Sequence, residues 1–254
     1  LTGGLLTRLG DVCVWALSRS AIGADIARWQ AVRPVLNAVK LAGYIDDLDL
    51  SPWDWIRDEV LPLMPLEVQS SPDGVIPIVR QLDRRTADAI TRVDAGPDFS
   101  PDGPMTTVSE RVDLVNHASI RFAEDIADTQ NRRTLTVQAT ADTSDPDTFA
   151  SPHALFSASR YGERRSEIKT RYVYDSASAG AILQQHLRAN CYPTVTRIYR
   201  AAPRWGWLDI GSAVLLTDAD IGLTDRLVEV IGRRWDGDAW LYNLAFDEDP
   251  LREG

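Results

Sequence analysis

The C-terminal stretch, residues 207–246, constrains the fold most strongly, because its pattern predicts β structure along most of its length. Large apolar residues alternate with smaller or polar ones, as in a strand with one buried face: Trp240, Tyr242, Leu244 and Phe246. Residues 227–231 are rich in β-branched side chains, which suit a pleated surface. Asp236-Gly237 separates the two runs and favours a tight hairpin turn. With a short strand at 213–216, we predict a β-meander.

Helical patterns are concentrated in the first third of the chain. Apolar residues at three- and four-residue spacing predict an amphipathic helix within 5–17. Residues 22–39 carry a further helical pattern, which we expect Pro34 to interrupt. Ser51-Pro52 predicts a helix start, since serine caps helices and proline suits the first turn. One later helix is predicted, at 176–190.

The remaining chain is predicted to be strands and loops. Residues 66–70 and 75–79 flank the turn sequence Ser71-Pro-Asp-Gly74, which predicts a hairpin. Further strands are expected at 112–123, 134–139 and 194–200. Proline and glycine predict a loop at 94–104, and an acidic surface excursion is expected at 142–152.

This order, helices and a hairpin followed by strands, one helix and a β-meander, indicates the α+β class rather than alternating α/β. We therefore expect an α/β domain of helices plus a hairpin at 1–85. A β-rich domain is expected at 86–254, with one helix near 176–190.

Net charge and cysteine content narrow the function classes. A net charge of −10 disfavours a broad nucleic-acid-binding surface, which needs clustered Lys and Arg. No apolar run approaches the roughly 20 residues that span a bilayer, so no membrane-spanning segment is expected. Cys13 and Cys191 are predicted to be buried free thiols, which fits assembly in a reducing cytoplasm.

Motifs for catalysis are not found in the sequence. His117, His153 and His186 have no zinc-ligand spacing to one another or to cysteine. The pair His186 and Cys191 lacks evidence of a third, orienting group. No serine-hydrolase elbow or phosphate-binding glycine loop occurs. We therefore predict no catalytic, cofactor-binding or metal-binding residues, no cofactor, and a protein that is not an enzyme.

Two residue types keep alternatives open. Carboxylates gather at Asp46 to Asp49, at Asp142 to Asp147, and at Asp218 and Asp220. Solvated loops are the default interpretation; the alternatives are a glycosidase pair of carboxylates and, at 142–147, a calcium site. Eight tryptophans suggest carbohydrate stacking, although core packing explains most of them. Trp205-Gly-Trp207 lies in a predicted turn and is the candidate partner contact.

Three stretches together resemble one family. The first runs from the leading helix through Leu41-Ala-Gly-Tyr44 and the Ser51-Pro-Trp helix to residues 66–78. The others are Arg171-Tyr-Val-Tyr-Asp-Ser-Ala-Ser-Ala-Gly180 and Trp207-Leu-Asp-Ile-Gly-Ser-Ala-Val-Leu-Leu-Thr-Asp218 with the closing hairpin. This layout resembles the baseplate hub (tail-tip) proteins of long-tailed bacteriophages and gene transfer agents. The resemblance implies tail-tube-like β-barrel domains with an inserted α/β domain.

The resemblance also implies a role and partners. Such hubs form a homotrimer ring of pseudo-sixfold symmetry that joins the hexameric tail tube to the threefold tail tip, and DNA passes through the lumen. The partners implied are the tail tube or distal tail protein ring, the tail-tip and fibre proteins and the tape measure protein. The implied location is the virion, with assembly in the host cytoplasm. Hubs usually have two tube-like barrels, so we expect this chain to be part of a longer hub.

The hub interpretation leads to a hypothesis about the charge of the lumen, and two other functions remain as alternatives. An acidic lumen would repel DNA phosphates, so Asp218 and Asp220 are expected to contribute to lumen charge or subunit contacts. The first alternative is a carbohydrate- or receptor-binding tail module, which predicts exposed Trp205 and Trp207. The second is a cell-wall hydrolase domain, which predicts a cleft with two facing carboxylates.

Overall fold

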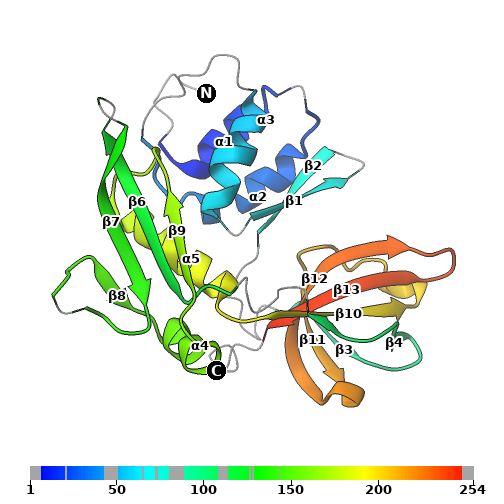
Figure 1. The fold of residues 1–254 in the computed structure, drawn as a ribbon. Helices are drawn as coiled ribbons and strands as arrows, with labels where there is room; N and C mark the ends of the chain where they lie inside the picture. Colours follow the sequence, from blue (N-terminus) through cyan, green and yellow to red (C-terminus); the bar gives the residue numbers. More distant parts are fainter. Residues whose placement is uncertain are drawn as a thin grey trace. The chain divides into compact units, whose positions relative to one another are not determined.

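A computed structural model describes residues 7–20, 22–42, 51–64, 66–71, 74–79, 89–107, 114–125, 127, 129–142 and 144–247. The chain divides into two compact units. Unit 1 comprises Leu1–Arg80 and Val115–Cys191, and unit 2 comprises Gln81–Leu114 and Tyr192–Gly254. Helices and strands are both present, which confirms the predicted α+β class (Figure 1).

Unit 1 begins with a helical group. Its helices are α1 (Leu9–Leu17), α2 (Ile26–Leu36) and α3 (Pro52–Trp55), and α3 continues into a π-helical turn (Ile56–Val60) and a 3₁₀ turn (Leu61–Leu63). The predicted capping of α3 is confirmed, since the Ser51 hydroxyl accepts a hydrogen bond from the Asp54 amide at 3.1 Å. This bond satisfies one of the amides that every helix start leaves unpaired.

Pro34 lies inside α2, so the predicted interruption of this helix is wrong. Proline cannot donate the backbone hydrogen bond of its turn. The loss of helix stability caused by Pro34 is limited, because α2 ends at Leu36, two residues later. The Asn37 amide still donates to the Arg33 carbonyl at 2.9 Å and closes the last turn.

The predicted hairpin of 66–79 is confirmed as β1 (Leu66–Ser71) and β2 (Gly74–Val79), which pair antiparallel. Residues 72–73 of its turn lie outside the described residues. Trp29 of α2 is fully buried and donates its indole N–H to the Val75 carbonyl at 3.1 Å. The hairpin is therefore fixed to the helical group by a buried side chain.

The second part of unit 1 is built on a four-stranded sheet, in the order β8-β7-β6-β9. Its strands are β6 (His117–Asp125), β7 (Gln130–Gln138), β8 (Thr148–Ala150) and β9 (Arg165–Lys169). β6 and β7 are antiparallel, whereas β9 pairs with β6, and β8 with β7, in parallel. The expected excursion at 142–152 thus contains a short strand, because β8 extends the ladder of β7.

Two helices accompany this sheet, and α5 lies against β6 and β7 (Figure 1). α5 (Ser176–Asn190) has the predicted bounds, and the Asp175 carboxylate caps it by accepting from the Ser178 amide at 2.9 Å. The core between them includes Ile120, Phe122 and Leu183, each fully buried. α4 (Pro152–Tyr161) was not predicted.

Unit 2 is a curled sheet in the order β3-β11-β12-β13-β10-β4, with β5 also paired to β10. Its strands are β3 (Thr91–Asp94), β4 (Phe99–Pro101), β5 (Thr106–Thr107), β10 (Thr194–Ala201), β11 (Ala213–Asp218), β12 (Leu223–Trp235) and β13 (Trp240–Asp247). The predicted meander is confirmed, with Trp235 paired to Trp240 across the hairpin. The expected loop at 94–104 contains β4, because Phe99 pairs with Ala201 and its ring fills the core.

The core of unit 2 is aromatic at its centre. Phe99 stacks on Tyr199 at 5.3 Å and on Tyr242 at 6.0 Å between ring centroids, and all three rings are buried. Offset aromatic contacts of this kind stabilise a core beyond the area they bury. The Tyr242 hydroxyl donates to the Trp205 carbonyl at 2.7 Å, and burial raises the pKa of Tyr242 to about 12.

The two units do not coincide with the division expected from the sequence, at 1–85 and 86–254. Residues 115–191 group with the N-terminal segment because β6, β7, β8 and β9 form their own sheet, on which α5 packs. The helix at 176–190 therefore belongs to unit 1, not to the C-terminal sheet.

Cys13 and Cys191 are both fully buried and outside any disulfide, as predicted. Burial raises the pKa of the Cys13 thiol to about 12, so the reactive thiolate is scarce at pH 8. We expect that neither cysteine of the folded protein reacts within minutes with a chromogenic disulfide reagent for thiols. The same protein in denaturant should titrate both thiols, and rapid labelling of the folded chain would contradict the buried positions.

Candidate functional site

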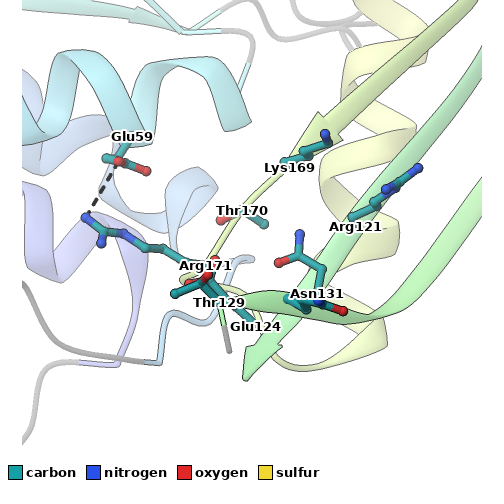
Figure 2. A pocket seen from close by; sticks show the side chains of 9 residues that line it. Glu59, Arg121, Glu124, Thr129, Asn131, Lys169, Thr170 and Arg171 are labelled. Carbon is teal, nitrogen blue, oxygen red and sulfur yellow. Dashed lines mark ion pairs between the residues drawn. The ribbon is translucent and has the colours of Figure 1, made fainter. Parts of the chain in front are cut away.

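A polar pocket of about 470 Å³ lies in unit 1, beside the end of the β6–β7 hairpin (Figure 2). Its lining comes from three separate stretches of the chain: Glu59, Arg121, Glu124, Thr129, Gln130, Asn131, Lys169, Thr170 and Arg171. Arg121 and Lys169 are partners in the β6–β9 register, so parallel pairing places two cations side by side. No sequence motif predicted this site, since its residues come together only through strand pairing and through the packing of the turn that carries Glu59.

Charges in this pocket are balanced by carboxylates. Glu167 contacts both Arg121 at 3.1 Å and Lys169 at 3.5 Å. Glu59 lies 3.8 Å from Arg171, the contact drawn in Figure 2. Exposed pairs of this kind contribute little to stability, about 0–1 kcal/mol each. The pocket is suited to holding water or a small polar group, and its lining side chains include no thiol or imidazole.

Two non-glycine residues near the pocket have positive φ angles. Ala123 has φ of 56° and Thr129 has φ of 55°, a region that few residues other than glycine adopt. Ala123 is skipped in the β6–β7 register, and its amide instead donates to the Val173 carbonyl at 2.8 Å. The unusual backbone therefore has a structural cause, since the Ala123 amide turns out of the ladder and ties the sheet to the segment before α5.

The three histidines are in separate places. His117 Nδ1 lies 2.7 Å from the exposed Glu163 carboxylate. His186 is largely buried on α5, and burial lowers its pKa. His153 lies near the start of α4 and lines a second cavity, described below. Within the described residues, no group of three His, Cys, Asp or Glu side chains is placed to hold a metal ion.

The acidic loop at 142–147 uses its carboxylates to form turns. Asp142 accepts from the Ser144 amide and hydroxyl at 2.9 and 2.6 Å, and these bonds lower the pKa of Asp142. Asp145 accepts from the Asp147 amide at 3.0 Å and the Thr148 hydroxyl at 2.9 Å. This geometry is that of solvated Asx turns. Asp46, Asp47 and Asp49 lie outside the described residues.

Asp218 differs most from its expected role. Its side chain is 1% exposed and accepts from Arg197 at 2.8 Å and from the Tyr199 hydroxyl at 2.6 Å. The expectation that Asp218 contributes to lumen charge or subunit contacts is therefore wrong, because its side chain is buried and paired with the Arg197 guanidinium. Asp220 is exposed, as expected. Burial and the bond to Asp218 both raise the pKa of Tyr199.

A second cavity, of about 710 Å³, lies in unit 1 between α5 and strands β7 and β8. Leu135 and Val137 form its floor, and Phe149, 48% exposed, stands at its side. Gly180 of α5 also lines it, and a Cβ added there would meet open space. This apolar groove is a further surface feature of unit 1.

Unit 2 carries two tryptophans that are about half exposed, Trp207 and Trp235. We define the tryptophan cluster as Trp205, Trp207, Trp235 and Trp240. Trp207 is 54% exposed and Trp235 is 47% exposed, whereas Trp205 and Trp240 are partly buried. The sequence singled out Trp205-Gly-Trp207 as the candidate partner contact; of the two rings expected to be exposed, Trp207 is, whereas Trp205 is partly buried. It did not single out Trp235, whose place in the alternating hairpin gave no signal of exposure. In the part of the chain that the structure describes, no helix is long and apolar enough to cross a membrane.

The fold is thus an α+β protein of two units, with a curled sheet in one of them. No protein-family model and no curated protein matches the chain. Among solved structures, it is similar to the 43 kDa tail protein of prophage MuSo2 from Shewanella oneidensis, with 13% identity, a TM-score of 0.49, and 94% of this chain and 66% of that one covered.

Two further solved structures are similar to the chain. The tail protein from Neisseria meningitidis MC58 has 15% identity and a TM-score of 0.45, covering 84% of this chain and 60% of that one. A chain of the native gene transfer agent virion has 11% identity and a TM-score of 0.49, covering 89% and 47%. In each case this chain spans less than two thirds of the protein it resembles.

Proposed function

We propose that this chain is a structural protein of a phage tail or of a related gene transfer agent, not an enzyme. The observation that carries the proposal is the curled sheet of unit 2, whose described strand order ends in two short strands, β3 and β4. Open sheet edges allow pairing between subunits. The proteins named above are tail or virion proteins, and the proposal gives this chain the same kind of role.

The finer proposal is a baseplate hub. Three copies would form a ring that joins the hexameric tail tube to the threefold tail tip, with DNA passing through the lumen. Of the stretches that resemble hubs, the described parts include the β1–β2 hairpin, the start of α5 and the β11–β13 meander. The partners proposed are the tail tube or distal tail ring, the tip and fibre proteins and the tape measure protein, and the location is the virion.

The proposed ring can be tested on the purified chain. We expect light scattering coupled to size exclusion to give a mass of three chains at high concentration. Negative-stain images of the same peak should show threefold rings, because each copy presents two different sheet edges to its neighbours. A monomer that lyses peptidoglycan in a zymogram would contradict the proposal and favour a hydrolase.

A further inference from the structure

The tryptophan cluster consists of two ring pairs that meet at Gly206. Trp207 stacks on Trp205 with 6.2 Å between ring centroids and 29° between ring planes. Trp235 meets Trp240 edge to face at 5.2 Å. Gly206 joins the two pairs, because a Cβ there would lie only 2.6 Å from the indole nitrogen of Trp240. Each of the two half-exposed rings, Trp207 and Trp235, therefore packs on a partly buried tryptophan.

The backbone that carries Trp207 is held in place from several sides. The Trp205 carbonyl accepts from the Leu208 amide at 2.9 Å and from the Tyr242 hydroxyl at 2.7 Å. Arg233 donates to the Leu208 carbonyl at 2.9 Å, and the Leu208 side chain is fully buried. The exposed indole thus stands on a turn anchored to the core. Preorganisation of this kind lowers the entropy lost when a ligand binds.

Three arginines around the cluster are paired with aspartates. Arg204 binds Asp98, and Arg233 lies 3.6 Å from Asp209. Arg200 contacts Asp236 at 3.1 Å at the hairpin beside Trp235. The surroundings of the cluster are therefore polar but close to neutral. They offer hydrogen-bond donors and acceptors without the excess of positive charge that phosphate chains require.

The size of the exposed aromatic surface indicates the kind of ligand. A tryptophan offers about 150–250 Å² of surface, so two half-exposed rings present roughly 200 Å². A stable protein interface buries about 800 Å² on each partner. The exposed rings are therefore small for a stable interface, whereas one or two sugar rings cover an area of this order.

From these observations we infer that the tryptophan cluster binds a neutral glycan. The apolar C–H faces of pyranose rings stack on Trp207 and Trp235, and the hydroxyl groups hydrogen-bond to the surrounding Arg–Asp pairs. This binding site does not depend on the tail role proposed above, since it is argued from the tryptophan rings and their neighbours and not from the edges of the sheet.

Isothermal titration of the full chain with chitohexaose and with cellohexaose tests this site. We expect at least one of the two hexasaccharides to bind. Trp207→Ala should weaken that binding about tenfold or more, as the loss of a central aromatic anchor does. Trp235→Ala should also weaken it. Trp15→Ala is the matched control, because Trp15 is 37% exposed on α1 of unit 1, and it should leave affinity unchanged.

The outcomes separate folding, assembly and recognition. Thermal melting checks each variant, and Trp207→Phe, which keeps an aromatic face, should retain part of the affinity. Failure of both hexasaccharides to bind would overturn the inference, as would binding that Trp207→Ala leaves intact. Loss of self-association in Trp207→Ala without any glycan binding would instead assign the cluster to subunit contact. The mass of the proposed trimer is measured in a separate experiment, so a negative result for glycan binding does not contradict the proposed tail role, and the reverse also holds.

Discussion

Asp218→Ala is expected to destabilise the protein by about 3–5 kcal/mol, because it leaves the guanidinium of Arg197 buried without its partner. The Arg197 side chain is 11% exposed and that of Asp218 is 1% exposed. The same change removes the acceptor of the Tyr199 hydroxyl and of the Asp220 amide. Urea unfolding followed by tryptophan fluorescence measures the change in the free energy of unfolding.

Three further variants show whether pairing is the cause. Asp220→Ala, next in the same turn but exposed, should change stability by no more than about 0.5 kcal/mol. Tyr199→Phe should cost only about 1–2 kcal/mol, since the Arg197 contact remains. Arg197→Met combined with Asp218→Leu should recover much of the loss, because apolar replacement of a buried ion pair is often neutral. Equal losses in Asp218→Ala and Asp220→Ala would refute the assignment.

The elements predicted correctly from sequence are those specified by local signals. The β12–β13 hairpin follows from alternation and from Asp236-Gly237, whose glycine has φ of 75°. α5 follows from its apolar spacing. α4 could have been found in the same way, since Ser151-Pro152 repeats the cap-and-proline pattern of Ser51-Pro52 and Ser151 does cap it. It was missed because the acidic stretch before it suggested a continuous loop.

Features that depend on distant partners were not predictable. The parallel pairs β6–β9 and β7–β8 join segments whose local sequence does not encode the direction of their partner. Asp218 looked like a loop carboxylate because Arg197, which neutralises it, lies 21 residues earlier on another strand. The polar pocket likewise requires Glu59 and Lys169 to come together. Such features follow from tertiary pairing, which overrides local preference.

Asn116 is the second position where a large loss is expected, and it connects β6, α4 and α5 of unit 1. Its side chain is 1% exposed. The amide nitrogen donates to the Ser157 hydroxyl at 3.2 Å and to the Gly162 carbonyl at 2.8 Å. The amide oxygen accepts from the Arg164 backbone N–H at 2.7 Å. Ser157 in turn donates to the Cys191 carbonyl at 2.5 Å, at the end of α5.

Asn116→Ala should therefore cost about 2–4 kcal/mol, because it removes three hydrogen bonds, one of them to the buried Ser157 hydroxyl, and opens a small cavity. Asn131→Ala is the matched control in the same unit; its partly buried side chain lines the polar pocket, and the change should cost less than about 1 kcal/mol. Hydrogen exchange should also quicken in α4 before β6, since α4 has few other contacts and opens first when this network is lost. Unchanged exchange in α4, with a loss no larger than in Asn131→Ala, would show that other packing holds this helix.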